Sequence, residues 1–273
     1  MPLAPLPRMR LKLTIEYAGT RYSGWQIQKN ARTVQGEIDR AIREVTGAST
    51  FELYGSGRTD AGVHALAQVA HLELPGSAGQ RWSAETLRRR INDALPFDIN
   101  ILRIDRARPQ FHARHDAVAR RYLYQIARRR TAFAKPFVWW IKDPLNDGAM
   151  RRAAARFVGT HDFRAFSDDE PGSKSTRVHV EAFDMDDHGD ILLIHIEGSH
   201  FLWKMVRRLV GVLAEVGRGG LTADQAAALL VEPSPLIARV TAPAAGLFLD
   251  RVYYPGETRD APAHPAVILR PVR

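Results

Sequence analysis

The segment LKLTIEY, residues 11–17, decides how the first half of the chain folds. Polar and apolar residues alternate in it, and this period of two predicts a strand whose buried face carries Leu11, Leu13, Ile15 and Tyr17. A helix is predicted next, because Thr33 is a suitable N-cap, apolar residues follow at helical spacing, and Gly47 can end it. A strand followed by an amphipathic helix indicates a layered fold of sheet and helices.

The same patterns continue to residue 105. Short strands are predicted at residues 51–54 and 67–74, a helix at residues 84–95 that stops before Pro96, and a further strand at residues 99–105. The resulting order, strand, helix, strand, strand, helix, strand, is the ferredoxin-like arrangement.

The second half repeats this order with insertions. A strand at residues 122–127 precedes a helix capped by Asn146, and a hairpin follows with its turn at residues 187–189. Ser199 is a candidate cap for a long helix with the apolar stripe Leu202, Val206, Leu209, Leu213 and Val216. A capping box of Thr222 and Gln225 opens a short helix, and residues 247–254 form the last predicted strand.

We therefore predict an α+β protein with two ferredoxin-like lobes. Their antiparallel sheets are expected side by side, with helices on the outer face and a cleft between the lobes that can accept RNA. The predicted domains are an N-terminal lobe at residues 1–107, a C-terminal lobe at residues 108–254 and a proline-rich tail at residues 255–273, to which we assign no function.

The amino-acid composition limits the kinds of partner and metal site that the chain can have. The chain has 273 residues, a net charge of +9 and no cysteine, so disulfides and thiolate metal sites are excluded. Most basic residues are arginine, which fits a polyanionic partner, although a general arginine bias would give the same composition. The residues expected to contact phosphates are the arginines within 88–90, 106–121 and 128–130. We see no signal peptide or membrane span and expect a cytoplasmic protein.

The glycine-rich loop GSGRTDAGVHA, residues 55–65, lies between two predicted strands. It lacks the Lys-Ser or Lys-Thr pair of a Walker A motif, and Asp60 stands where a dinucleotide fingerprint needs its third glycine. What remains is a tight loop with Arg58 and Asp60 two residues apart, on one side of an extended backbone. A turn in which Asp60 caps its own backbone is the alternative interpretation.

This loop resembles the GRTDAGVHA signature of the tRNA pseudouridine synthase A family. Further blocks resemble the family in its order over residues 11–254. They are EYAGTRYSGWQIQ from Glu16, TVQG from Thr33, FHARHDAVARRYLYQI from Phe111, HDFRAF from His161, HFLWKMVRRLVG from His200 and AAGLFLDRVYY from Ala244.

The resemblance implies a role for each matching residue. It makes Asp60 the catalytic nucleophile and Arg58 a residue that holds the flipped nucleotide. It makes Tyr122 the platform that stacks on the target base, Arg207 the basic partner of the aspartate, and Leu247 an apolar contact. It also implies a homodimer that isomerises uridine in the anticodon stem-loop of tRNA, at positions 38 to 40. That isomerisation requires no cofactor and no metal.

Simpler interpretations exist for the residues outside the loop. Tyr122 and Leu247 would by default be core residues of strands, and Arg207 a solvated arginine. The chain also departs from the family pattern at Arg208, at Trp203-Lys204 and in the acidic segment 167–176. These departures concern the choice of uridine rather than the chemistry. The pair His112 and His115 invites a metal interpretation, which we reject because no carboxylate constellation accompanies it.

Two other function classes remain open at this stage. A non-catalytic RNA-binding protein or RNA chaperone would suit the charge and fold equally, but it leaves the loop unexplained. A phosphate-cradling nucleotide enzyme is disfavoured by the glycine spacings. Within the favoured class, Asp60 can add either to the ribose C1′ or to the uracil ring.

Overall fold

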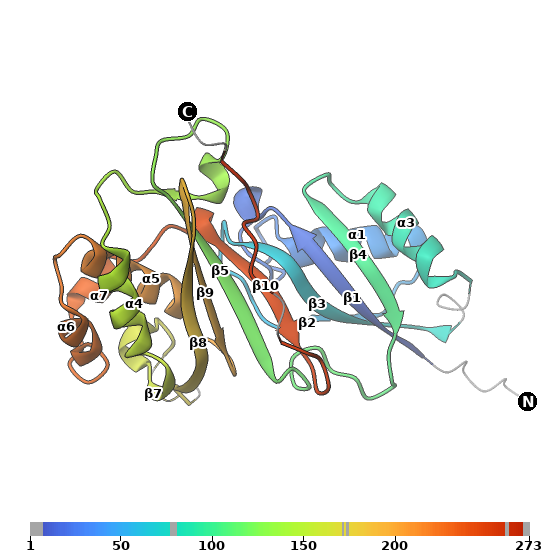
Figure 1. Ribbon diagram of the computed structural model, residues 1–273. Coiled ribbons are helices and arrows are strands. Elements are labelled where there is room, and N and C mark those ends of the chain that lie inside the picture. The colour runs from blue at the N-terminus through green and yellow to red at the C-terminus, as the bar shows by residue number, and fades with distance from the viewer. Residues whose placement is uncertain (1–7, 77–80, 171, 173–174, 260–261, 270–273) are drawn as a thin grey trace, which may run out of the picture. The chain divides into compact units, whose positions relative to one another are not determined.

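The computed structural model describes residues 8–76, 81–170, 172, 175–259 and 262–269. It is a mixed α+β structure with mostly antiparallel strands and few helices (Figure 1). The chain separates into two compact units, one made of Met1–Val118 with Leu249–Glu257 and the other of Ala119–Phe248 with Thr258–Arg273.

The first unit follows the predicted order of elements. They are β1 (Met9–Tyr17), α1 (Val34–Thr46), β2 (Glu52–Gly55), β3 (His64–Leu74), α3 (Ala84–Ala94) and β4 (Ile99–Arg106), with a short 3-10 helix at Gly19–Arg21. The helices α1 and α3 pack on each other and cover one face of this sheet (Figure 1).

Register places the glycine-rich loop between two paired strands. β1 lies antiparallel between β3 and β4, with Leu13 opposite Ala70 and Ile104. β2 is also antiparallel to β3, with Gly55 opposite Ala70. The loop therefore leaves the sheet at the end of β2 and re-enters it at the start of β3.

Burial confirms the predicted inward faces of the first unit. The apolar residues of β1 and the apolar stripes of α1 and α3 are almost inaccessible to solvent. They are Leu11, Leu13, Ile15, Val34, Ile38, Ile42, Leu87 and Ile91. Each such side chain stabilises the fold by about 1.5–3 kcal/mol relative to exposure.

Residues Leu249–Glu257 belong to the first unit although they lie near the end of the sequence. β10 (Leu247–Tyr253) pairs with β3, and the backbone N–H of Val118 donates to the carbonyl of Tyr253 at 2.9 Å. The Tyr254 hydroxyl donates to the carbonyl of Ala113 at 2.7 Å. The sequence assigned residues 249–254 to the C-terminal lobe, but these long-range bonds group them with the N-terminal unit.

The second unit contains β5 (Ala119–Ala127), β6 (Trp139–Trp140), α4 (Asp147–Ala155), β7 (Gly159–Asp162), β8 (Arg177–His188), β9 (Ile191–Gly198), α5 (Met205–Gly217), α6 (Ala223–Ala228) and α7 (Pro235–Arg239). Its antiparallel strand order is β5-β9-β8-β7, with the short β6 running parallel to β5. β8 and β9 form the predicted hairpin, which turns at Gly189 with φ +72°.

The long helix α5 differs from the prediction. It begins at Met205 rather than near Ser199, and its N-cap is Lys204, whose φ of 62° is left-handed. Ser199 does not cap it: its hydroxyl lies 3.1 Å from Nδ1 of His200. The helix is buried on nearly every face rather than along one stripe, because α4, α6 and α7 all contact it.

Part of the C-terminal tail packs on the second unit. Leu269 joins a buried cluster with Ala127 and Val138, and the backbone N–H of Ala266 donates to the buried side chain of Gln125 at 2.7 Å. Within the described residues, no helix is long and apolar enough to cross a membrane.

Candidate active site

The loop between β2 and β3 is held by the segment that precedes α1. The backbone N–H of Trp25 donates to the carbonyl of Thr59 at 3.1 Å, and the Tyr17 hydroxyl lies 2.8 Å from the Thr59 hydroxyl. The N–H of Gly19 donates to Nδ1 of His64 at 2.9 Å. Burial raises the pKa of Tyr17 to about 12, so its hydroxyl keeps its proton at neutral pH.

Two glycines make this close approach sterically feasible. A Cβ on Gly19 would lie 1.9 Å from the carbonyl oxygen of Val63. Gly24 has φ +90°, and a Cβ there would lie 2.6 Å from the carbonyl oxygen of Thr59. Any larger residue at either position would push the loop away from its support.

Buried polar side chains fix the start of the loop. The Ser56 hydroxyl donates to Oε1 of Gln68 at 2.7 Å, and Nε2 of Gln68 donates to the carbonyl of Gly57 at 3.1 Å. Ser56 and Gln68 are both inaccessible to solvent. A satisfied buried network of this kind restricts the loop to one conformation.

Arg58 and Asp60 lie in this restrained loop. Arg58 is exposed, Thr59 is buried and Asp60 is half-buried, an alternation that fits the prediction that the first and last point to one side. The turn closes after Asp60, because the N–H of Val63 donates to its carbonyl at 3.1 Å and Gly62 has φ +79°.

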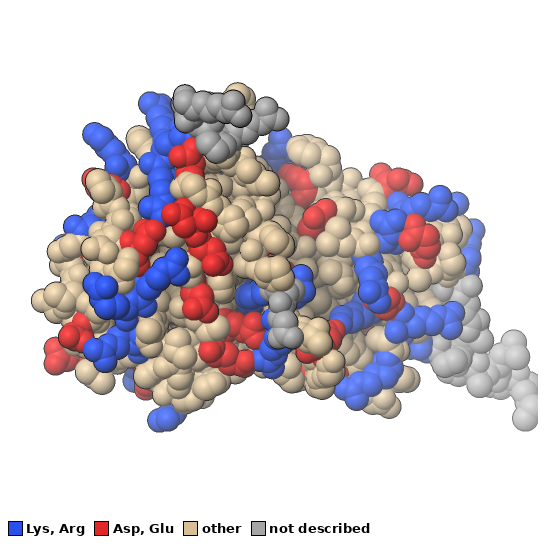
Figure 2. Space-filling model, in the orientation of Figure 1, with Lys and Arg blue, Asp and Glu red and all other residues tan. Residues whose placement is uncertain are grey.

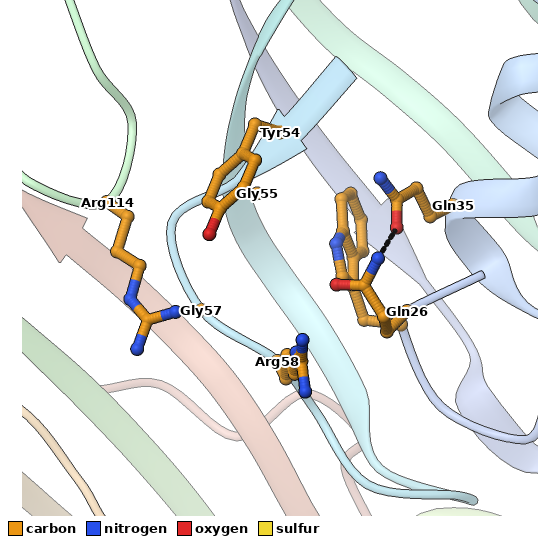
Figure 3. A pocket seen from close by; sticks show the side chains of 8 residues that line it. Gln26, Gln35, Tyr54, Gly55, Gly57, Arg58 and Arg114 are labelled. Carbon is orange, nitrogen blue, oxygen red and sulfur yellow. Dashed lines mark hydrogen bonds between the residues drawn. The ribbon is translucent and has the colours of Figure 1, made fainter. Parts of the chain in front are cut away.

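A pocket opens beside Arg58 within the first unit (Figure 3). Its walls come from the segment before α1, from α1 itself, from the end of β2 and from the loop that follows β4. The lining residues are Trp25, Gln26, Gln35, Tyr54, Gly55, Gly57, Arg58 and Arg114. The sequence analysis named Arg58 as a site residue and placed Arg114 among the arginines expected to contact phosphates. It gave no site role to the others, although Trp25 and Gln26 lie in the EYAGTRYSGWQIQ block.

The remaining candidates belong to the second unit. Tyr122 on β5 is half-buried rather than a core residue, and its ring meets that of Phe201 edge-on at 5.1 Å. Leu247, at the start of β10, is 5% exposed. The structure thus places Arg58 and Asp60 in one loop of the first unit, and Tyr122, Arg207 and Leu247 in the second unit. The family resemblance is what assigns all five to one site.

Arg207 is anchored to the chain that follows α7. Its Nε donates to the carbonyl of Ala242 at 2.7 Å, and the N–H of Ala242 donates to the carbonyl of Arg207 at 3.0 Å. Tyr124, which the sequence analysis did not single out, donates its hydroxyl to the carbonyl of Pro243 at 2.8 Å. Burial raises the pKa of Tyr124, and the nearby guanidinium of Arg207 opposes that rise.

The acidic segment 167–176 is joined by ion pairs to the residues around the start of α5. Asp168, from the acidic segment, pairs with Lys204 at 2.6 Å and with the buried Arg208. Two further hydrogen bonds join the same segments: the backbone N–H of Trp203 donates to the carboxylate of Asp169 at 3.1 Å, and the backbone N–H of Asp168 donates to the carbonyl of Trp203 at 3.4 Å. Two segments that are distant in the sequence are therefore held together by ion pairs and hydrogen bonds.

Several of the arginines expected to contact phosphates are paired within the protein. Arg88 binds Glu85, Arg108 binds Asp116, Arg128 binds Asp147 and Arg129 binds Asp190. On the face shown in Figure 2, basic side chains are likewise interspersed with acidic ones. Phosphates would compete with these carboxylates for the guanidinium groups.

The histidines after β4 form an aromatic cluster with Tyr54. The rings of His112 and His115 lie 4.1 Å apart, and His112 lies 4.7 Å from His71. Nδ1 of His112 accepts hydrogen bonds from the backbone N–H groups of Arg114 and His115. In the part of the chain that the structure describes, no group of three or more potential ligands could hold a metal ion.

Comparisons with known proteins agree with the sequence resemblance. The profile of the family described as tRNA pseudouridine synthase matches residues 13–116 and 153–255. The protein named tRNA pseudouridine synthase A of Thermoanaerobacter sp. strain X514 is 39% identical over 246 residues, which is 89% of this chain and 98% of the relative. The protein of that name from Acetivibrio thermocellus is 40% identical over 247 residues, covering 89% of this chain and 99% of the relative.

One match among solved structures is much weaker. A chain from the crystal structure of a Cbf5-Nop10-Gar1 complex matches with a TM-score of 0.33 and 9% identity. The match covers 75% of this chain and 45% of that chain, so this chain spans less than half of it.

The family profile covers both units, and the relatives match nearly from end to end. The chain therefore belongs to the tRNA pseudouridine synthase family.

Proposed function

We propose that this protein is an isomerase that converts uridine to pseudouridine in tRNA, in the anticodon stem-loop at positions 38 to 40, with Asp60 as the nucleophile. The observation that carries the proposal is the match to the tRNA pseudouridine synthase family, which includes the loop of Arg58 and Asp60. The restraint of that loop by Trp25, Tyr17 and Gln68 supports it, because covalent catalysis needs a positioned nucleophile.

The chemistry is an isomerisation, so no atom is gained or lost. The bond between C1′ and N1 breaks, the base turns, a bond from C1′ to C5 forms, and the C5 proton moves to a ring nitrogen. The Asp60 carboxylate adds to the ribose C1′ or to the uracil ring as a covalent catalyst and is released at the end.

The target base must leave its stack before this chemistry begins. In our proposal Tyr122 stacks on the extruded uracil, Arg58 holds the flipped nucleotide, Arg207 keeps Asp60 ionised and Leu247 gives an apolar contact. The half-buried position of Tyr122 and the anchored side chain of Arg207 are compatible with these roles. The proposal includes the two ferredoxin-like lobes, with RNA bound in the cleft between them.

The proposed assembly is a cytoplasmic homodimer that binds tRNA through its arginines, without a cofactor. Light scattering of the purified protein tests the dimer. A molecular mass equal to that of one chain would remove this part of the proposal and leave the chemistry untouched.

The decisive experiment incubates the purified protein with unmodified tRNA in the presence of a metal chelator and without added nucleotide. We expect pseudouridine at one or more of positions 38 to 40, mapped by carbodiimide modification and primer extension. Pseudouridine only at other positions would refute the anticodon assignment but keep the isomerase. Tight tRNA binding without any conversion would instead favour the non-catalytic RNA-binding class.

A further inference from the structure

We infer that the pocket beside Arg58 binds a second nucleotide of the RNA, the one next to the target uridine. The base of this nucleotide would stack on Tyr54, its phosphate would bind Arg114, and its base edge would meet Gln26. The inference rests on the proposed function, since it places the pocket next to a bound RNA strand. We call these three residues the Tyr54 subsite.

Tyr54 has the geometry of a stacking platform. It is 39% exposed although it is a large aromatic residue at the end of a paired strand. Behind it lies the ring of His71, stacked with an interplanar angle of 14° and a centroid distance of 5.8 Å, and the ring of His112 lies at 5.0 Å. A supported ring loses little conformational freedom on binding, and bases of any sequence can stack on it.

The support of Tyr54 is itself rigid. His71 has a fully buried side chain, and its Nδ1 accepts the backbone N–H of Ala113 at 3.1 Å. On the other side of the ring, Nε2 of His71 is hydrogen-bonded to Glu52. The imidazole under Tyr54 is therefore fixed to two different segments, and the platform is preorganised.

Gln26 is oriented by a second amide. Its Nε2 donates to Oε1 of Gln35 at 2.8 Å, while Nε2 of Gln35 donates to the carbonyl of Leu53 at 2.8 Å. Gln35 is 7% exposed and also accepts the N–H of Ile27. With one N–H committed, Gln26 presents its carbonyl oxygen and its other N–H to the pocket, a donor and acceptor pair of the kind that reads a base edge (Figure 3).

Arg114 is the third residue of the Tyr54 subsite. It is exposed, lines the same pocket and extends toward Gly57 from the loop after β4 (Figure 3). Its backbone N–H donates to Nδ1 of His112, which fixes the base of the side chain beside the platform. A guanidinium, an aromatic ring and an amide around one opening match the phosphate, base face and base edge of one nucleotide.

The Tyr54 subsite lies beside the loop that carries the proposed nucleophile. Arg58, also in the pocket wall, is two residues from Asp60 in the same restrained loop. A nucleotide held here would fix the strand on one side of the extruded uridine. The Tyr54 subsite would then contribute to the choice of uridine by reading its neighbour.

The test measures equilibrium binding of three RNAs to protein that carries Asp60→Asn, so that no conversion intervenes. One RNA is the intact anticodon stem-loop, and the other two carry an abasic site on the 5′ or the 3′ side of the target uridine. We expect Tyr54→Ala to weaken binding of the intact RNA at least about fivefold and Tyr54→Phe to preserve it. For one of the abasic RNAs, Tyr54→Ala should cause no further loss.

A second measurement addresses the polar contacts. Arg114→Ala should lower the slope of log affinity against log salt by about 0.7, the value for one phosphate of a single strand. Arg103→Ala is the matched control, because Arg103 is an exposed arginine of the same unit that pairs with Asp105 outside the pocket. Gln26→Leu should reduce the discrimination among the four bases at the neighbouring position.

The proposal is overturned if Tyr54→Ala binds the intact RNA as its parent does, or if it loses the same factor with both abasic RNAs. An Arg114→Ala slope equal to that of Arg103→Ala would also contradict it. Circular dichroism and the Tyr54→Phe variant distinguish lost stacking from lost folding. Because these readouts are binding constants, the subsite can be confirmed even if the native protein converts no uridine, an outcome that would refute only the proposed function.

Discussion

At the scale of single residues, the loop between β2 and β3 is supported by a tight contact between Gly55 and Trp25. A Cβ on Gly55 would lie 2.7 Å from the indole of Trp25, which is 1% exposed and cannot move aside cheaply. We expect Gly55→Ala to lower the free energy of unfolding by about 1–3 kcal/mol in urea titrations.

Gly57→Ala is the matched control for this substitution, because a Cβ there has no atom within 4 Å. Its effect should stay within about 0.5 kcal/mol. Equal losses for the two variants would show that the contact between Gly55 and Trp25 does not restrain the loop.

Tyr122 can be tested by separating its ring from its hydroxyl. Tyr122→Phe keeps the ring, so tRNA affinity should survive, whereas Tyr122→Ala should lose about 1–3 kcal/mol of stacking with the base. Filter binding measures the affinity, and turnover by Tyr122→Phe shows whether the hydroxyl takes part in proton transfer. Normal binding and turnover by Tyr122→Ala would make the residue structural, through its contact with Phe201.

The lowered pKa of His112 should make the free energy of unfolding depend on pH. Burial, followed by the nearby imidazoles of His115 and His71, lowers the pKa of His112 below its ordinary value of 6.5. The folded state therefore binds this proton more weakly than the unfolded state does, and stability should fall as the pH decreases from about 7 through 6.5 toward the lower folded pKa. Chemical denaturation of the parent and of His112→Gln between pH 7 and 5 measures the effect. An unchanged slope in the variant would contradict it.

At the scale of elements, the start of α5 depends on an ion cluster rather than on a local cap. Asp168 binds Lys204, which has a left-handed backbone, and the buried Arg208 in the first turn. We expect Asp168→Asn to lower the free energy of unfolding by about 1–3 kcal/mol, since it weakens hydrogen bonds between charged groups.

The control for Asp168→Asn is Asp224→Asn, which removes an exposed ion pair with Arg156. Thermal or urea unfolding should show less than about 1 kcal/mol for that variant. If both substitutions cost the same, the cluster at Asp168 does not hold the helix start.

This contrast explains which elements could be predicted. The caps Thr33 and Asn146 and the capping box of Thr222 with Gln225 are confirmed, because each is a contact within three residues. Ser199 was wrong as a cap because the partner that decides the start of α5 lies 36 residues before Lys204, at Asp168. Local patterns cannot contain that information.

The same reasoning applies to the site. That Arg58 and Asp60 lie together could be predicted because they share one short loop with a recognisable pattern, while their roles stay predictions. The Tyr54 subsite could not, because its residues come from three segments that meet only through the sheet register and the bonds of His71 and Gln35. Tyr124 is a core residue, which is the default for a buried tyrosine on a strand, and its hydroxyl is satisfied by the carbonyl of Pro243.

At the scale of the whole molecule, a net charge of +9 predicts binding that depends on salt. The logarithm of the affinity for tRNA should fall linearly with the logarithm of the salt concentration. The slope should be several units, because each phosphate contact contributes about 0.7 to 0.9. Because arginines such as Arg88 and Arg128 are already paired with carboxylates, we expect a slope smaller than the number of arginines in the predicted ranges. Fluorescence titrations between 50 and 200 mM salt (about the range over which such slopes are measured) test this, and a salt-independent affinity would contradict it.

The proposed isomerisation depends on the carboxylate of Asp60. Asp60→Asn keeps the size of the side chain but removes the nucleophile, while binding to tRNA rests on many phosphate contacts elsewhere. The direct test is single-turnover formation of pseudouridine, measured beside equilibrium binding of the same tRNA and circular dichroism of the variant. We expect background conversion with nearly unchanged affinity in a folded Asp60→Asn protein. Conversion by that folded variant at the rate of the parent would contradict it.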